Sequence, residues 1–319
     1  MTRLLFTTDL HGSTGCWRKC LTAIMRYKAD VAIISGDLTA KAVVPIIRDE
    51  NGTYTFKFLN KSYKTKKEEE LKEPINKIKS YGFYPYICTK EEASALSKDR
   101  EKLLKLFDYL AVQTMKEWLE IAEEKLGDKL RNGSLKLIIM PGNDDTFAID
   151  EVIKENALTI YPLGRVVTVN ETHEILSFDY VNSSPWQTPR EAPEGELKKM
   201  LDEIFRKATN YEHLIFLCHC PPYDSGLDMA PKLDEKMRPV YSFGQPITEA
   251  VGSKAVREAV EKYQPKLGLF GHIHEAYGFV KIGRSLCLNP GSEYDRGILK
   301  AYVVEMSRDK IDRFWRIEG

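Results

Sequence analysis

Seven residues of metal-binding type stand in five short motifs, and each motif follows a predicted strand. The motifs are Asp9-Leu10-His11, Gly36-Asp37, Gly142-Asn143, His219 and Gly271-His272-Ile273-His274. Two carboxylates, one amide oxygen and four imidazoles suit borderline divalent ions such as Mn, Fe, Zn or Co better than Ca or a lone Mg. Only two of the chain's six histidines, His173 and His213, lie outside these motifs. The sequence therefore predicts a metal centre.

The spacing of the motifs predicts that their side chains converge. Groups at the carboxyl ends of strands meet at one rim of a sheet, where open α/β sheets bind ligands. In Asp9-x-His11 and His272-x-His274, positions i and i+2 would share one side of an extended segment. A glycine before Asp37, and those before Asn143 and His272, would let the backbone approach the site without a Cβ clash.

Two divalent ions in this donor set predict phosphoester chemistry. The ions bring about +4 and the two carboxylates about −2, so the centre would attract phosphate. Such a pair, typically about 3.5–4 Å apart, can hold a bridging hydroxide for in-line attack and clamp phosphoryl oxygens. The predicted reaction is hydrolysis of a small phosphodiester or phosphomonoester.

The elements that must position these residues alternate between strands and helices, which is typical of an α/β (α+β) fold. Strands are predicted at 3–8, 31–35, 135–140, 213–218 and 266–270. Helices are predicted at 15–27, 148–155, 195–207 and 253–263. Further strand-like runs at 165–169, 175–180, 278–281, 285–288 and 299–306 predict a second, more antiparallel sheet. Two sheets packed face to face, with helices outside, account for the pattern.

Residues 42–131 interrupt this alternation and are interpreted as an insertion into a single domain spanning 1–319. Strand-like runs at 43–49 and 53–59 flank Asn51-Gly52, a strong hairpin signal. A Lys/Glu-rich stretch at 61–79 is interpreted as a solvated face. A long helix is then predicted at 91–126, with a capping box at Thr89 and Glu92 and its end at Gly127. The insertion is expected to cap the site or to form a homodimer contact.

Composition limits the class of protein and its partners. The chain has 319 residues, 43% of them hydrophobic, with 47 basic and 47 acidic residues. This neutral balance argues against a general nucleic-acid binder. No apolar run approaches the roughly 18 residues of a membrane-spanning helix, so no membrane association is expected. The six cysteines form no Cys-x-x-Cys pair, and we expect reduced, structural thiols in a cytoplasmic protein.

Together, the motifs resemble those of the calcineurin-like metallophosphoesterases. That family carries Asp-x-His, Gly-Asp, Gly-Asn-His-Asp/Glu, a lone His and Gly-His-x-His, in this order. The resemblance implies a four-layer αββα sandwich of two mixed sheets. It also implies one metal held by Asp9, His11, Asp37 and His274, and another by Asp37, Asn143, His219 and His272, with Asp37 bridging. His219-Cys-Pro-Pro and Asn289-Pro-Gly-Ser292 look most similar to the small bacterial and archaeal phosphoesterases grouped with cyclic-nucleotide phosphodiesterases.

One position departs from the family pattern, because Asn143 is followed by Asp144 where the family has histidine. An aspartate near two cations should stay ionised, and it would cut the local charge from about +2 to about +1. Three interpretations remain. Asp144 could orient a metal-bound water or a ligand histidine, which we favour. It could be raised in pKa by burial and act as the acid. Or the substrate could leave without an acid.

Two other functions are compatible with the motifs. A nuclease of the DNA-repair type shares the metal motifs, but the neutral charge and the lack of a basic, aromatic patch argue against it. A scaffold of the same fold that binds metal without catalysis is the second alternative, and Asp144 is its main support. Such a scaffold would be expected to lose ligands first, whereas all seven positions are filled here.

Overall fold

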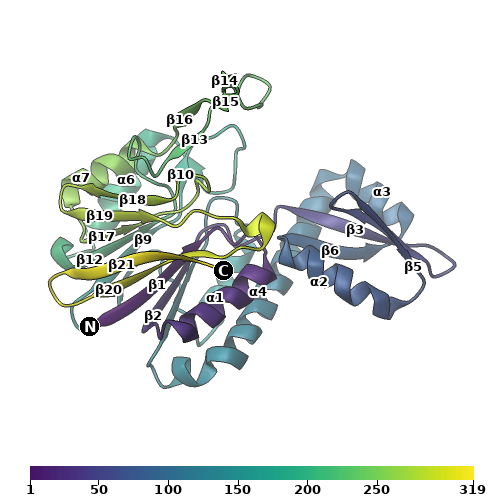
Figure 1. Cartoon of the computed structure of the whole chain (residues 1–319), viewed down its shortest axis with the longest axis horizontal. Helices are drawn as coiled ribbons and strands as arrows, with labels where there is room; N and C mark the ends of the chain where they lie inside the picture. The colour runs from purple at the N-terminus through teal and green to yellow at the C-terminus, as the bar shows by residue number, and fades with distance from the viewer.

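The computed structural model describes residues 1–319 and contains two mixed sheets packed face to face (Figure 1). The first sheet has the order β21-β20-β1-β2-β7, and the second has the order β18-β19-β17-β12-β9-β8. The strands of the first sheet are β1 (Thr2–Thr8), β2 (Val31–Ser35), β7 (Lys136–Met140), β20 (Lys300–Met306) and β21 (Ile311–Glu318). Those of the second are β8 (Val166–Thr168), β9 (Glu174–Phe178), β12 (Leu214–Cys218), β17 (Leu267–Leu269), β18 (Gly278–Ile282) and β19 (Ser285–Asn289).

Three apolar layers hold the sandwich together, which confirms the predicted four-layer arrangement. The layer between the sheets contains residues from both, such as Phe6 and Ile215. A second layer joins the first sheet to helices α1 (Thr14–Arg26), α4 (Arg100–Arg131) and α5 (Ala148–Glu155). A third joins the second sheet to α6 (Glu194–Phe205) and α7 (Lys254–Tyr263).

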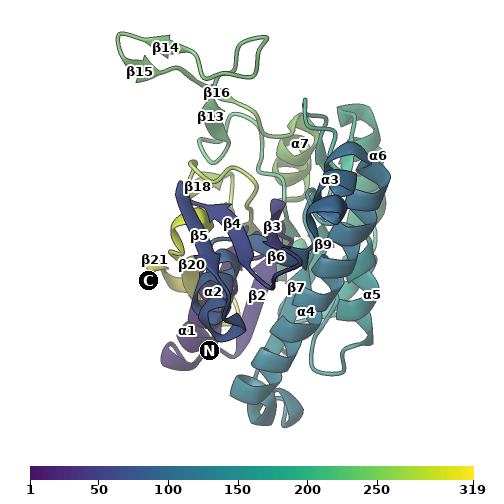
Figure 2. The same cartoon turned by 90° about the vertical axis from the view of Figure 1, so that its right-hand side faces the viewer.

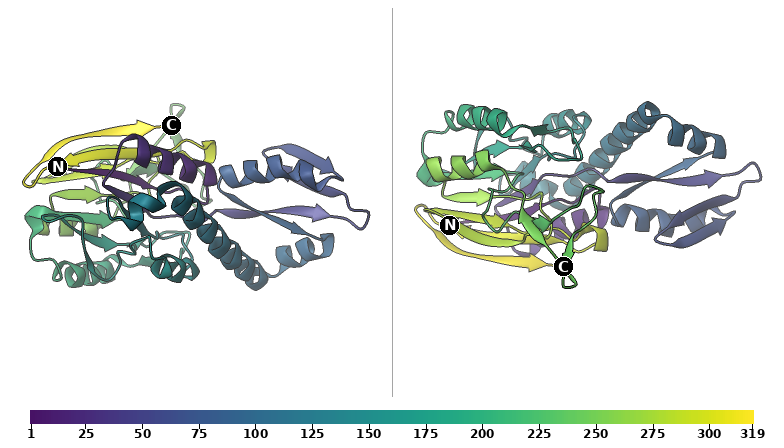
Figure 3. Two further views of the ribbon diagram at one scale, coloured as in Figure 1. Left: turned by 90° about the horizontal axis from the view of Figure 1, so that it is seen from below. Right: turned by 90° about the horizontal axis from the view of Figure 1, so that it is seen from above.

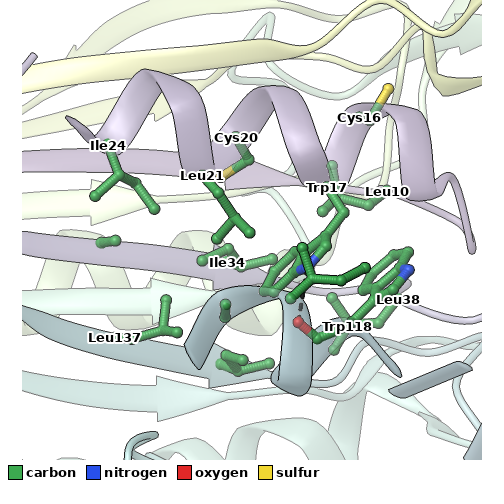
Figure 4. Packing of buried hydrophobic residues seen from close by; sticks show 14 of the residues in the cluster. Leu10, Cys16, Trp17, Cys20, Leu21, Ile24, Ile34, Leu38, Trp118 and Leu137 are labelled. Carbon is green, nitrogen blue, oxygen red and sulfur yellow. Dashed lines mark hydrogen bonds between the residues drawn. The ribbon is translucent and has the colours of Figure 1, made fainter. Parts of the chain in front are cut away.

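A pair of tryptophans fixes α4 against α1 (Figure 4). The rings of Trp17 and Trp118 are stacked with their centroids 5.0 Å apart, and Trp17 Nε1 donates to the carbonyl of Trp118 at 2.9 Å. Leu10 and Leu38, which adjoin predicted metal ligands, pack in the same cluster. The loops that carry ligands are therefore anchored in the core.

The assignment of strands to sheets differs from the sequence prediction in two respects. Residues 299–306 were predicted in the second sheet, but β20 pairs antiparallel with β1 in the first. The second sheet is not mainly antiparallel, because β9, β12, β17 and β19 run parallel. Every residue of β12, β17 and β20 is buried, as expected of central strands covered on both faces. Continuous apolar runs of this kind do not reveal which sheet they join.

The predicted hairpin is confirmed, but it belongs to a larger unit that projects from the sandwich (Figures 1 and 3). A four-stranded sheet has the order β5-β4-β3-β6. Its elements are β3 (Ala42–Arg48), β4 (Tyr54–Phe58), β5 (Lys61–Thr65), η1 (Glu68–Leu71), α2 (Lys72–Ser80) and β6 (Phe83–Cys88). A small separate core around Ile46, Phe56 and Ile78 stabilises it. The charged stretch at 61–79 contains a strand and a helix, which its composition did not predict.

The predicted helix at 91–126 is two helices. The capping box of Thr89 and Glu92 begins α3 (Lys90–Lys98), as predicted. Asp99 ends α3 and caps α4, accepting a hydrogen bond from the amide of Lys102 at 3.1 Å. Gly127 lies inside α4, and the positive φ of +74° that ends the helix belongs to Gly133 instead. The second half of α4 packs in the helix layer of the sandwich.

Short strands complete the chain. They are β10 (Val181–Asn182), β11 (Glu191–Ala192), β13 (Met229–Pro231), β14 (Tyr241–Ser242), β15 (Gln245–Pro246) and β16 (Thr248–Ala250). The β14-β15 hairpin extends outward beyond the second sheet (Figure 2). All six cysteines are free and buried. None of the helices combines the length and the apolar character needed to cross a membrane.

Candidate metal centre

The structure brings the seven predicted ligands together beyond the carboxyl ends of β1, β2, β7, β12 and β17. The ligand atoms of Asp9, His11 and His274 lie within 4.8 Å of one another and form the first group. Those of Asp37, His219 and His272 lie equally close together and form the second group. The seventh residue, Asn143, joins the second group, because its Oδ1 lies 3.0 Å from Nε2 of His219. The two groups agree with the two ligand sets that the resemblance implies.

The carboxylate of Asp37 lies between the two groups. Its Oδ2 lies 3.6 Å from Nε2 of His11, and its Oδ1 lies 3.3 Å from Nε2 of His219. One oxygen therefore faces each group, as a bridging carboxylate requires. Asp37 is buried, so its charge must be compensated by neighbouring groups or by cations.

Several buried polar atoms of the centre have no ordinary partner. Asp9 uses Oδ2 to accept from the amide of His272 at 3.0 Å, whereas its buried Oδ1 has no hydrogen-bond partner. Nε2 of His11 lies 3.1 Å from Nε2 of His274, so two ring nitrogens face each other. Asp9 Oδ1 lies 3.4 Å from the same His274 nitrogen. Unpaired oxygens and facing imidazoles are the donors that divalent ions bind, so these residues fit a dinuclear centre.

The pKa values of both carboxylates and of two of the four histidines favour the forms that bind metal. Burial would raise the pKa of Asp9, but two neighbouring histidines lower it to about 2. Burial is likewise outweighed for Asp37, whose pKa lies well below its usual range. Burial lowers the pKa of His272 to about 4 and that of His11 well below its usual value. Anionic carboxylates and neutral imidazoles are the forms that bind metals. Burial would lower the pKa of the other two histidines, but Asp37 raises that of His219 to about 9 and Asp9 raises that of His274, so these two imidazoles would release a proton when a cation binds.

The ligand-bearing loops are tight turns, so the predicted extended geometry is wrong. Asp9, His11, Asp37 and His272 all have positive φ, at 54°, 41°, 44° and 67°. Non-glycine residues seldom adopt this left-handed conformation, and it is concentrated at functional sites. Four of the seven candidate ligands are therefore placed by a left-handed turn after a strand, whereas Asn143, His219 and His274 have no positive φ. The expected close approach at glycine is confirmed at Gly36, where a Cβ would lie 1.9 Å from Nδ1 of His219.

Asp145 organises two ligand loops, and the sequence motifs assigned it no role. The fully buried carboxylate accepts hydrogen bonds from the amides of Leu38, Thr39 and Gly142 at 2.7 to 2.9 Å. It therefore ties the loop of Asp37 to the loop of Asn143. A signal was present in the sequence, because the family pattern places an acidic residue two positions after the asparagine.

Thr188 orients the side chain of Asn143. Asn143 Nδ2 donates to Thr188 Oγ1 at 2.9 Å, and that hydroxyl donates to Glu191 Oε1 at 2.6 Å. The amide is thereby fixed with Oδ1 toward His219. Nothing in the sequence motifs marked Thr188, which is 45 residues from Asn143.

Thr188→Val is expected to weaken metal binding about 10- to 100-fold, as is typical when a partner of a ligand is removed. Valine keeps the volume but accepts no hydrogen bond, so the amide loses its fixed orientation. A competition titration with a metal indicator dye measures the affinity. The matched control is Thr248→Val on the exposed strand β16, which should leave the affinity unchanged. Equal affinities of Thr188→Val and the wild type would contradict this role.

Asp144 stands at the edge of the centre and faces a lysine. Its amide donates to Asp37 Oδ1 at 2.9 Å, and its carboxylate forms an ion pair with Lys41. Burial, together with the charge of Asp37, raises the pKa of Asp144. Its carboxylate also forms a third group of possible ligand atoms with His11 and Asp37, within 4.8 Å. No sequence motif marked Lys41 as a residue near the centre.

A cavity of about 410 Å³ adjoins the centre at His274. Its lining is mostly polar and charged, with two tyrosines. The residues are His274, Glu275, Tyr277, Ser292, Glu293, Tyr294, Asp295, Lys300 and Arg316. Tyr294 also contacts His11, with ring centroids 4.5 Å apart, and so lies between the cavity and the ligands.

Comparisons with known proteins support the fold and leave the family open. No protein-family model matches the chain. The uncharacterized protein MJ1162 of Methanocaldococcus jannaschii is 28% identical over 158 residues, which is 49% of this chain and 64% of that protein's length. One crystal structure aligns over 99% of this chain and 98% of its own, with a TM-score of 0.58 and 13% identity. TT1561 of Thermus thermophilus aligns over 94% and 93%, with a TM-score of 0.51 and 12% identity. At these identities, the two structures show a shared fold alone.

Proposed function

We propose that this chain is a metal-dependent phosphoesterase that hydrolyses a small phosphodiester or phosphomonoester at a dinuclear centre. The observation that carries the proposal is Asp37, whose two oxygens face two separate ligand groups. The order of the motifs along the chain, which resembles that of the calcineurin-like metallophosphoesterases, supports the same function.

The chain's own residues bind and orient in this proposal. Two divalent ions, drawn from Mn, Fe, Zn and Co, would supply Lewis acidity and a nucleophile at neutral pH. Asp9, His11 and His274 would hold one ion. Asp37 would be a ligand of both ions. His219, His272 and Asn143 complete the second set. The cavity beside His274 gives the remainder of a small substrate room to bind.

A screen of substrates and metals tests the function. Protein stripped with a chelator is reconstituted with Mn, Co, Ni or Zn and assayed with phosphomonoesters, phosphodiesters, nucleotides and a single-stranded oligonucleotide. We expect turnover of a small ester that depends on about two bound ions per chain and is lost on rechelation. Turnover of the oligonucleotide alone would favour a nuclease. Two bound ions without turnover of any ester would favour a non-catalytic scaffold.

A further inference from the structure

Lys41 places a positive charge at the centre that no motif accounts for. Its ammonium forms an ion pair with Asp144, which in turn flanks the bridging ligand Asp37. The side chain of Lys41 is 41% exposed and that of Asp144 is 23% exposed, so a substrate can reach the pair. An ammonium has three donors, and the carboxylate of Asp144 does not use all of them.

The charge of Lys41 cancels the charge that Asp144 introduces. Two divalent ions with Asp9 and Asp37 leave about +2, and an ionised Asp144 reduces this to about +1. The ammonium of Lys41 restores the sum to about +2. A phosphoester that approaches Asp144 therefore meets a neutral pair with free N–H donors, and it is not repelled by a lone carboxylate.

The backbone at Lys41 is held at the root of the projecting unit. Lys41 directly precedes β3, and its amide donates to the carbonyl of Gly82 at 3.3 Å, just before β6. Gly82 itself lies against the centre, because a Cβ there would be 2.3 Å from the carbonyl oxygen of His11. The point where the chain enters the unit and the turn between α2 and β6 thus both border the ligands, and together they fix the position of the Lys41 backbone.

We propose that Lys41 binds a phosphoryl oxygen of the substrate and that Asp144 is a positioning residue that holds the ammonium there. Asp144 stands at the sequence position of the histidine that follows the asparagine in the family pattern. This inference rests on the proposed function, since it concerns the same substrate at the same centre. It also gives Asp144 a role that requires neither a protonated carboxyl nor a direct contact with substrate.

Four variants and two measurements test this assignment. The variants are Lys41→Met, Lys41→Arg, Asp144→Asn and the control Lys79→Met. Lys79 of α2 forms an ion pair with Glu117 of α4 at 2.5 Å, and its side chain is 27% exposed. It is therefore a half-buried, paired lysine outside the centre. Calorimetry measures the Kd of inorganic phosphate for the manganese-loaded protein, whose metal content is measured in parallel. The kcat and KM for an ester that the wild type hydrolyses form the second readout.

Lys41→Met is expected to weaken phosphate binding about 10- to 100-fold, the value of one charge-assisted hydrogen bond, with metal content unchanged. Lys41→Arg should recover most of the binding. Asp144→Asn should bind phosphate as tightly as the wild type or more tightly, because a negative charge is removed. Its kcat should nevertheless fall about 10-fold, since the ammonium is no longer held. Lys79→Met should match the wild type in both measurements.

Three results would overturn the assignment. The first is a Lys41→Met protein that binds phosphate normally with its full metal content. The second is an equal loss in Lys79→Met, and the third is a loss of metal in Lys41→Met, which would show that the lysine acts on the centre itself. If the metal-loaded wild type neither binds phosphate nor hydrolyses any ester, the proposed function fails first, and the assignment of Lys41 fails with it.

Discussion

Asp37→Ala is expected to lower phosphoester turnover on the order of 10³-fold or more, equivalent to about 4 kcal/mol in the activation barrier. The change removes the carboxylate that presents a different oxygen to each ligand group, with Oδ2 3.6 Å from His11 and Oδ1 3.3 Å from His219. Neither group then has its shared anion, so at most one ion should remain bound. Metal analysis by mass spectrometry and steady-state turnover measure the two effects together.

A matched aspartate controls for the loss of one charge. Asp234 is half-buried, pairs with Arg238 at 2.7 Å and lies in the segment that leads to the β14-β15 hairpin. Asp234→Ala should keep both ions and wild-type turnover. An Asp37→Ala protein that retained two ions and full activity would contradict the bridging role and, with it, the observation that carries the proposed function.

Asp145→Ala is expected to lower the free energy of unfolding by about 3–5 kcal/mol, a large effect for one residue. Removal of this carboxylate leaves the buried amides of Leu38, Thr39 and Gly142 without acceptors. Urea denaturation of the metal-free protein isolates this contribution from metal binding. Asp145→Asn keeps one acceptor oxygen and should lie between the wild type and the alanine variant.

The metal centre should also respond to Asp145→Ala, because the carboxylate connects the loops of Asp37 and Asn143. We expect weaker metal binding in the folded variant at low temperature, measured by indicator competition. A variant that unfolds like the wild type would show that the three amides find other acceptors. Intact metal affinity in a destabilised variant would show that the loops hold their positions without Asp145.

The convergence of the candidate ligands could be predicted from the sequence because each follows an apolar strand that ends abruptly. Strand ends such as Thr8 and Ser35 fix where Asp9 and Asp37 stand in three dimensions. Their conformation could not be predicted, because a left-handed turn after a strand leaves no mark beyond an occasional glycine. The residue types indicated metal binding, and only the structure revealed the left-handed turns that carry four of these residues.

The residues that support the ligands were out of reach because their contacts are not local. Lys41 and Asp144 are 103 residues apart and come together only because β2 and β7 are neighbours in the first sheet. The projecting sheet was underestimated for a different, local reason. Its strand β5 is rich in lysine and mostly exposed, so it lacks the apolar alternation that predicts a strand.

The left-handed backbone at four of the candidate ligands lowers the folding stability of the chain when no metal is bound. Asp9, His11, Asp37 and His272 each carry a Cβ at positive φ, which costs on the order of 1 kcal/mol per residue where glycine would cost little. Aspartate and histidine in this conformation lower the stability of the metal-free chain, and cation binding would offset that loss.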